Sequence, residues 1–460
     1  MSILYQVLKP IVTIAVHVFY KKIEIVNRER LNEEGPTLII SNHNNAFLDA
    51  VVVEMFAKPQ VYSIARGDVF NNSFVRSVLT KLCILPIFRK EEGPGLMHKN
   101  EETFEKCVEL LGKKQHIIMY PEGDCVTEKR LRKLRKGAAR IALRAEAGND
   151  FNLNLRVLPI CLNYSAAKKF RSNLFINVGN PISLKEYEKQ YADDKVRAVN
   201  NLTLHMEKEM RMLLVELEHH SNDHLYEEVL ELYKPASTQN LKDDHSANRQ
   251  IAATLNHFHH RHHAQLQHLK VNLHDYHTTL NKLGISVRLF NPKSIDGINM
   301  VSAAKDLFLT GLGMPLHLTG IAFNYLPYRF AYRTADKKVK QAHFHASVNF
   351  VIGMFSWIGY YLFQLLIIGI ISKSWLVLLA FTFAIPATGL YSLNFYSFMK
   401  KTKARWNLLS FIQNNEALSK ILLLNREELV SEVERMKEIY RREKEAKSKE
   451  HQFSNTIDSV

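Results

Sequence analysis

The chain of 460 residues carries a formal net charge of +15, and 46% of its residues are hydrophobic. This length leaves room for roughly two to four domains. A basic balance suits nucleic acid, an anionic membrane or phosphorylated substrates. The sequence has no zinc-finger spacing and no RNP-like aromatic box, so we expect no nucleic-acid partner. The four cysteines form no Cys-x-x-Cys pair, which predicts reduced thiols.

The N-terminal segment from Ile3 to Tyr20 is apolar but contains Lys9 and Pro10. It has neither a basic start nor a small-residue cleavage site, which argues against a secretory signal peptide. We expect residues 1–27 to form an interfacial helix that lies on a membrane surface. The alternative is a buried first helix of the domain that follows.

Residues 28–183 alternate short apolar runs with stretches of helical spacing. The predicted strands are 37–41, 61–65, 84–88, 116–120, 156–162 and 174–178. The predicted helices between them are 47–56, 73–82, 97–111 and 137–147. Strands that alternate with helices predict an α/β fold with a mostly parallel sheet flanked by helices. In such sheets the functional site lies beyond the carboxyl ends of the strands.

Residues 184–300 are polar and helical in period, and we expect them to form a helical arm outside the sheet. The predicted helices of the arm are 196–217, 225–233 and 252–283. Its histidines include His259 and His263, whose i, i+4 spacing would suit a metal ion. No carboxylate motif accompanies them, so a polar helix face is the preferred interpretation, with no metal or cofactor.

A membrane region is predicted over residues 301–410. The segment Leu307–Tyr325 is apolar but interrupted by three glycines and a proline, which indicates a re-entrant or interfacial course. The segments Phe350–Ser372 and Ser374–Ser397 carry no charged residue, and each is long enough to cross a bilayer, for which ~20 residues suffice. Only Lys373 separates them. They predict a two-helix transmembrane hairpin over residues 350–397.

Basic residues flank the predicted hairpin on both outer sides: Arg329, Arg333, Lys337, Lys338 and Lys340 before it, and Lys400, Lys401, Lys403 and Arg405 after it. By the positive-inside rule, both flanks and the sheet domain face the cytoplasm. The alternative is a buried helical pair in a soluble core. Within the last segment, 411–460, residues 425–450 are dense in Glu, Lys and Arg and predict a charged, solvated single helix that frays into a disordered tail.

His43 and Asp49 form the first candidate site. His43 follows a predicted strand closely, and the unperturbed pKa of histidine lies near neutrality, as a general base requires. Asp49 lies six positions further, where a tight turn into a helix can bring its carboxylate to the imidazole. A carboxylate in that place holds the base in one tautomer. Taken alone, the pair is equally compatible with a turn histidine and a helix-entry aspartate.

Three further features follow in the sequence. Arg89 ends an apolar run, where a guanidinium suits either a phosphate or a structural salt bridge. Glu122 and Gly123 lie in a turn after a predicted strand, where the backbone can approach a ligand closely. The basic run 129–136 comes next and can neutralise a phosphate, contact anionic lipid or form a solvated face.

In this order, these parts resemble the PlsC-like glycerolipid acyltransferases over residues 36–165. The four matching blocks are His43 with Asp49, Arg89, the turn Pro121-Glu122-Gly123, and the apolar strand Val157-Leu158-Pro159-Ile160. The resemblance implies that His43 is the catalytic base and Asp49 its partner. It further implies that Arg89, Glu122 and Gly123 bind the acceptor. The acyl donor would be acyl-CoA or acyl-carrier protein, acting as a co-substrate.

The sequence departs from the common family pattern in two places. Five residues separate His43 from Asp49, where four are commoner, and the wider spacing resembles a subgroup that includes dual-substrate glycerol phosphate acyltransferases. Asp124 replaces the commoner Ser or Thr after the Glu-Gly pair. An acidic side chain beside an anionic acceptor is unfavourable, which leaves the identity of the acceptor open.

The resemblance therefore predicts a multi-pass membrane enzyme with an acyltransferase domain over residues 28–183. It would transfer a fatty acyl group to a hydroxyl of lysophosphatidate or glycerol 3-phosphate at the bilayer. Lysophosphatidate ranks slightly ahead, on family frequency alone. The alternatives are another lyso-lipid acceptor, a membrane scaffold or binding protein without catalysis, and a hydrolase. The hydrolase ranks last because the sequence has no GxSxG-type elbow.

Overall fold

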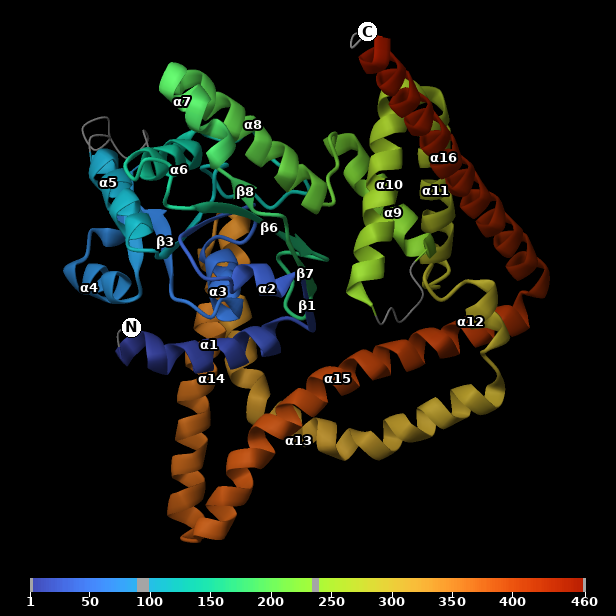
Figure 1. Cartoon of the computed structure of the whole chain (residues 1–460). Coiled ribbons are helices and arrows are strands. Elements are labelled where there is room, and N and C mark those ends of the chain that lie inside the picture. Colours follow the sequence, from blue (N-terminus) through green and yellow to red (C-terminus); the bar gives the residue numbers. More distant parts are fainter. Residues whose placement is uncertain (1–2, 89–98, 234–239, 458–460) are drawn as a thin grey trace. The chain divides into compact units, whose positions relative to one another are not determined.

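The computed structural model describes residues 3–88, 99–233 and 240–457. The chain divides into two compact units, each made of two segments (Figure 1). The first unit comprises Met1–Val215 and Pro327–Ile358, and the second comprises Glu216–Leu326 and Gly359–Val460. Both units are therefore discontinuous in sequence. The chain leaves the first unit after Val215, returns to it at Pro327 and leaves it again after Ile358.

The first unit is built on a sheet that has eight strands among the described residues. The strands are β1 (Lys22–Val26), β2 (Thr37–Ser41), β3 (Val61–Arg66), β4 (Ile84–Ile87), β5 (His116–Met119), β6 (Arg156–Tyr164), β7 (Asn173–Val178) and β8 (Ile182–Ser183). Their order is β1-β7-β6-β2-β5-β3-β4, with β8 paired to β6. The pairings of β6 with β7 and β8 are antiparallel, and all other pairings are parallel. The predicted α/β fold with a mostly parallel sheet is confirmed.

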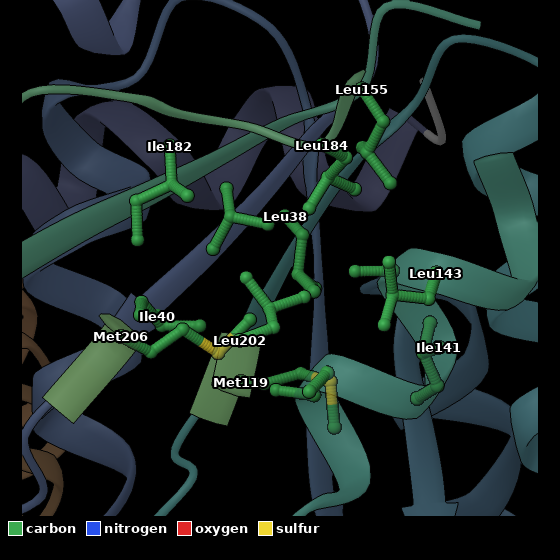
Figure 2. Packing of buried hydrophobic residues seen from close by; sticks show 14 of the residues in the cluster. Leu38, Ile40, Met119, Ile141, Leu143, Leu155, Ile182, Leu184, Leu202 and Met206 are labelled. Atoms are coloured by element: carbon green, nitrogen blue, oxygen red, sulfur yellow. The ribbon is translucent and has the colours of Figure 1, made fainter. Parts of the chain in front are cut away.

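One face of the sheet is covered by α5 (Lys99–Gly112), α6 (Gly137–Ala147) and α8 (Lys195–Leu213). Leu38 and Ile40 of β2 point to this face and pack in one cluster with Leu202 and Met206 of α8 (Figure 2). The alternation of side chains along a strand sends the intervening Ile39 to the opposite face. Both faces of β2 are therefore buried, as is typical of a parallel sheet.

The opposite face is covered by α1 (Ile3–Phe19), α3 (Phe47–Phe56) and the start of α14 (Ala342–Ser372). Phe19 of α1 contacts Phe350 of α14 edge to face, with the ring centroids 5.6 Å apart. Ala346 is fully buried in the same cluster. A segment more than 300 positions downstream of α1 thus completes the core of the sheet domain.

The structure differs from the predicted organisation at both ends of the sheet domain. Residues 22–26, expected within an N-terminal helical segment, form β1 and pair with β7. The alternation of Ile23 and Ile25 with Glu24 suits such a strand. Helix α8, expected in an arm outside the sheet, buries Ala198, Leu202 and Met206 against it. Its apolar residues recur at helical spacing and cover a face of the sheet that would otherwise contact water.

Helix α1 presents two different faces. Tyr5, Val16 and Phe19 are buried within the first unit. Ile3 and Ile14 keep 80% and 67% of their surface exposed. The buried face fits the interpretation of a first helix of the domain, and the exposed face fits the interfacial helix predicted from the sequence.

The second unit contains a bundle of α9 (Asp223–Tyr233), α10 (Leu241–Arg261), α11 (His263–Lys282) and α16 (Glu416–Ile457), with the short α12 (Pro292–Asp296) following α11. The predicted helix 252–283 is interrupted at His262, which separates α10 from α11. Arg426 of α16 is buried and donates from Nη1 to the Val287 carbonyl at 2.8 Å. The charged C-terminal helix therefore packs in the bundle instead of extending alone into solvent.

Three helices among the described residues are long and apolar enough to cross a membrane, not the two expected. They are α13 (Met300–Lys338), α14 and α15 (Trp375–Asn414). The additional candidate is α13, which includes the segment predicted to be broken by glycine and proline. The structure instead shows a continuous helix there. Two of its glycines, Gly313 and Gly320, face α15 closely.

Small residues bring α13 and α15 close together. A Cβ on Gly320 would clash with the Thr388 backbone, and one on Gly313 would clash with the Phe395 ring. Asn324 donates from Nδ2 to the Ile385 carbonyl at 3.1 Å. Small residues and interhelical hydrogen bonds of this kind are the usual means by which helices associate in a bilayer, where the hydrophobic effect is absent between them.

Candidate functional site

His43 and Glu122 follow the carboxyl ends of two neighbouring parallel strands, at equivalent positions in their pairing. Ile40 of β2 is in register with Met119 of β5, and each site residue lies three positions after its member of this pair. The carboxyl ends of these strands therefore bring the two residues together. The His43 backbone N–H donates to Glu122 Oε1 at 2.9 Å.

The predicted pair of His43 and Asp49 is formed. His43 Nδ1 lies 2.9 Å from Asp49 Oδ2. The Asp49 side chain is fully buried, whereas 17% of the His43 side chain remains exposed. The imidazole also stacks on the Tyr120 ring, with centroids 4.0 Å apart. With Nδ1 directed at the carboxylate, Nε2 is the ring nitrogen that remains for a substrate proton.

The Asp49 carboxylate is held by several donors besides the imidazole. Asp49 lies in the first turn of α3, and its Oδ2 accepts from the Asn44 and Asn45 backbone N–H groups at 2.8 and 2.9 Å. Oδ1 accepts from the Tyr164 hydroxyl at 2.6 Å. Burial and the adjacent Asp49 charge raise the pKa of Tyr164 well above its ordinary value, so its hydroxyl stays a donor. These bonds fix the carboxylate orientation that the histidine tautomer requires.

The loop between His43 and Asp49 contains a strained residue. Ala46 has φ 46° and ψ −135°, a conformation that glycine tolerates better than alanine. Its N–H donates to Cys125 Sγ at 3.1 Å. On the other side of the loop, buried Ser347 of α14 donates from Oγ to the Asn45 carbonyl and accepts from the Leu48 N–H at 3.2 Å. Contacts from two distant segments therefore hold Ala46 in this conformation.

Both carboxylate oxygens of Glu122 are occupied by protein donors. Oε1 accepts from His43 N–H, and Oε2 accepts from the backbone N–H and Nε of Arg132 at 3.2 and 3.1 Å. Burial raises the pKa of Glu122, and the hydrogen bonds from His43 and Arg132 oppose that shift. The carboxylate thus positions the His43 backbone directly. Its role in acceptor binding stays a prediction.

Gly123 and Asp124 acquire structural roles from the basic run that follows them. Gly123 has φ +70°, and a Cβ there would clash with the Arg135 side chain. Arg132 Nη2 donates to the Asp124 carbonyl, and Arg132 Nη1 lies 3.9 Å from the Asp124 carboxylate. A guanidinium therefore offsets the acidic side chain that departs from the family pattern. Arg132 and Arg135 lie against the turn, while Lys133, Arg135 and Lys136 stay exposed, so the run also presents a solvated basic face.

Arg89 lies outside the described residues. The residue before it, Phe88, is the last described position of its segment, and both backbone polar groups of Phe88 are bonded to the Asn100 side chain, at 2.7 and 2.8 Å. The predicted phosphate-binding role of Arg89 stays a prediction.

Sequence reasoning missed three residues that shape the site. Tyr164 lies two positions after a predicted strand, and Arg132 lies in a basic run that was considered as a whole. An aromatic residue at the carboxyl end of β6, the neighbour of β2, was a usable signal for Tyr164. Ser347 carries no such signal, because only the docking of α14 on the sheet domain brings it to the loop.

A metal ion does not fit the dyad well. His43, Asp49 and Cys125 place three potential ligand atoms within 4.8 Å of one another. However, Asp49 Oδ2 already accepts from two backbone N–H groups as well as facing Nδ1. Burial also raises the pKa of Cys125, which disfavours the thiolate that a metal would need. The donor set suits a hydrogen-bonded base.

The histidine-rich helices pair mostly with carboxylates. His257 and His262 contact the two oxygens of Glu443 at 2.9 and 2.8 Å. His259, considered with His263 as a metal pair, stacks on His219 with ring centroids 3.7 Å apart. Among the described residues, the groups that gather three potential ligands in this unit are Glu218/His219/His260, His224/Glu228/His274 and His257/His262/Glu443, and His263 is in none of them.

Part of the chain is similar in sequence to known proteins. Residues 22–163 match the sequence model of a family described as Acyltransferase. Glycerol-3-phosphate O-acyltransferase 2 of Saccharomyces cerevisiae is 25% identical over 188 residues, which cover 40% of this chain and 25% of the yeast protein. The similarity thus spans about a quarter of the length of that relative.

Among solved structures, the 1-acyl-sn-glycerophosphate acyltransferase PlsC from Thermotoga maritima aligns with a TM-score of 0.33 and 15% identity. The alignment covers 45% of this chain and 78% of that one. The family match contains His43, Asp49, Glu122 and Gly123. Residues 22–163, which form most of the sheet domain, are therefore similar in sequence to the acyltransferase family.

Proposed function

We propose that the protein transfers a fatty acyl group from an acyl thioester to a hydroxyl of a phosphorylated glycerol at a membrane. The observation that carries the proposal is the 2.9 Å contact between His43 Nδ1 and the buried, multiply bonded Asp49 carboxylate. A base oriented in this way can take a hydroxyl proton at Nε2. The family match over residues 22–163 supports this chemistry.

The reaction needs no covalent enzyme intermediate. As His43 Nε2 takes the proton, the acceptor oxygen attacks the thioester carbonyl and forms a new C–O bond. Collapse of the tetrahedral intermediate breaks the C–S bond, and the leaving thiolate recovers the proton from His43. Asp49 stabilises the imidazolium between these steps and keeps Nδ1 protonated. The donor is acyl-CoA or acyl-carrier protein.

Glycerol 3-phosphate is the acceptor we favour, with lysophosphatidate second. The name of the yeast relative supports this order, which reverses the one expected from family frequency. Arg132 offsets the charge of Asp124, which removes one objection to an anionic acceptor beside the turn. Arg89 would contact the phosphate.

The three long apolar helices support a membrane location, and we propose that the sheet domain faces the cytoplasm. Basic residues flank the α14–α15 hairpin on both outer sides, as the positive-inside rule requires for cytoplasmic segments. Cytoplasmic acyl donors and a soluble glycerol phosphate would then reach the site directly.

The test uses the purified full-length protein with a labelled acyl-CoA, offered glycerol 3-phosphate and lysophosphatidate side by side. Wild type should acylate at least one acceptor, and His43→Ala should lose roughly 100-fold or more of that rate. His220→Ala, which changes an exposed histidine in the second unit, is the matched control. Transfer to neither acceptor would reject the proposed reaction, and full activity of His43→Ala would reject the mechanism.

A further inference from the structure

The first end of α13 lies on the same side of the bilayer as the sheet. Between the sheet domain and Met300, no described segment is a candidate span. The undescribed segments 89–98 and 234–239 are far shorter than the ~20 residues that a spanning helix needs. The chain therefore reaches Asn299 without crossing the membrane.

The other end of α13 lies on that side as well. Helix α14 begins at Ala342, four positions after α13 ends at Lys338. The first turns of α14 belong to the sheet domain, because Ala346 and Phe350 are buried in its core. Ser347 is bonded to the loop of the site. Both ends of α13 are thus held on the sheet's side.

The first half of α13 runs along α15 toward the tip of the hairpin at Lys373. Asp306 forms an ion pair with Arg405, and Gly320 packs against Thr388. Phe323 then contacts Phe381, with ring centroids 5.9 Å apart. Along these contacts the residue numbers of α13 rise while those of α15 fall toward Lys373. This half of α13 therefore approaches the tip of the hairpin.

The second half of α13 runs along α14 and away from the tip. Ser356 Oγ donates to the Pro327 carbonyl at 3.4 Å, and Gly353 faces Ala331. The Tyr332 ring then lies 6.0 Å from that of His345. Along these contacts the residue numbers of α13 rise while those of α14 fall toward its first turns. This half of α13 therefore runs back toward the sheet domain.

The turning point coincides with a break in the hydrogen-bond ladder of α13. Pro327 has no N–H, so the carbonyl of Phe323, four positions earlier, loses its helical donor. Gln364 of α14 supplies the replacement, donating from Nε2 to that carbonyl at 2.9 Å. In a bilayer an unsatisfied carbonyl is costly, so a freed group is tolerated where a neighbouring helix bonds to it.

The same device occurs at a second proline. Pro386 of α15 frees the Thr382 carbonyl, and the Tyr361 hydroxyl of α14 donates to it at 2.9 Å. Tyr361 and Gln364 lie three positions apart and so share one face of α14. This face bonds to one carbonyl freed by proline in each neighbouring helix.

We propose that α13 is a re-entrant helix: its two ends lie on the membrane face that carries the sheet, and its middle, around Phe323, inserts between α14 and α15. Its partner is the bilayer. Phe308, Leu312 and Leu326 keep 69%, 69% and 59% of their surface exposed and would contact lipid. Length and hydropathy alone allow α13 to cross, but a single crossing would put its two ends on opposite sides of the bilayer.

The test is cysteine labelling of the full-length protein in sealed vesicles with a membrane-impermeant maleimide, before and after permeabilisation. Asn299→Cys and Gln341→Cys report the two ends of α13, Ser374→Cys reports the hairpin tip, and Asn415→Cys reports the end of α15. Three of the four native cysteines are buried, and wild type measured in parallel supplies the background.

The expected result is that the positions 299, 341 and 415 label from one side and position 374 from the other. Labelling of Gln341→Cys together with Ser374→Cys would mean that α13 crosses, and would overturn the proposal. Labelling of all four variants from the same side would overturn it too, because α14 and α15 would then not cross. Neither result depends on the acyl-transfer activity.

Discussion

Ser347 Oγ donates a hydrogen bond to the Asn45 carbonyl, although the two residues are 302 positions apart in the chain. The same hydroxyl accepts from the Leu48 N–H, so it bridges both sides of the strained Ala46. Because Asp49 follows directly, a residue of a membrane-region helix helps to define where the Asp49 carboxylate lies.

Ser347→Ala should lower kcat of acyl transfer roughly 10- to 100-fold, because small displacements of a catalytic group have effects of this size. The KM for the donor should change little, since Ser347 is buried away from solvent. Ser356→Ala is the matched control, because its hydroxyl bonds within α14 and to α13 only. Hydrogen exchange of peptides that cover residues 42–49 should quicken in Ser347→Ala alone. Unchanged exchange would show that the hydroxyl does not hold the loop.

Asp49→Asn should reduce kcat roughly 100-fold or more while the fold is retained. The amide keeps one oxygen for the donors around it but loses the negative charge that stabilises the imidazolium. Circular dichroism and the melting temperature would check the fold, and labelled acyl transfer would measure the rate. Activity close to that of wild type would mean that His43 is not oriented by this carboxylate.

Gly123→Ala should destabilise the first unit by about 1–3 kcal/mol, because φ is +70° and the new Cβ meets Arg135. Arg135→Ala in the same chain removes the clash but leaves the backbone strain. The double variant should therefore recover part of the lost stability in chemical denaturation. Equal stability of Gly123→Ala and wild type would contradict the turn geometry.

Glu54 makes stability depend on pH near neutrality. Burial raises its pKa from 4.5 to about 7, and the nearby Lys9 opposes this shift. The protonated form is favoured in the folded state, so its contribution is complete below pH 4.5 and is lost as pH rises through about 7. Glu54→Gln should match wild type in melting temperature at pH 5 and exceed it at pH 8.5. Glu29→Gln, which changes an exposed glutamate, should keep the melting temperature of wild type at both pH values. A melting-temperature difference between Glu54→Gln and wild type that is the same at pH 5 and pH 8.5 would show that Glu54 does not cause the pH dependence.

Gln364→Leu should lower the melting temperature of the membrane-embedded protein, because the Phe323 carbonyl would lose its donor. Pro327→Ala restores a backbone N–H four positions after that carbonyl. The effect of Gln364→Leu should accordingly shrink in the Pro327→Ala background. Additive effects of the two changes would show that the side chain does not replace the missing helical bond.

Much of the sheet domain could be predicted because its signals are local. Strand β2 and helix α3 were predicted with the bounds that the structure shows, since an apolar run and a helical period each lie within a few residues. The order His43, Asp49, Glu122 was visible for the same reason. Strand β1 was not predicted because it is a short strand at the edge of the sheet. Its five residues contain too few alternating apolar and polar side chains to indicate a strand.

The rest of the site depends on contacts that no local pattern encodes. Tyr164 bonds Asp49 and Arg132 bonds Glu122 from separate segments. Ser347 bonds the loop between His43 and Asp49 from a helix whose composition suggested only a membrane role. The glycines of α13 predict breaks in a helix, whereas in the structure Gly313 and Gly320 allow α15 to approach. A sequence shows that a glycine is present but not what lies against it.

The burial of Ala346 and Phe350 in the sheet domain has a consequence for biosynthesis. A ribosome must translate past Phe350 before the face of the sheet lined by Val16 and Leu48 can be covered. Domains generally fold from the N-terminus as synthesis proceeds, but this one stays incomplete until the membrane helices emerge. Insertion of α14 into the bilayer would thus coincide with closure of the core, so that the loop carrying His43 is assembled only at the membrane.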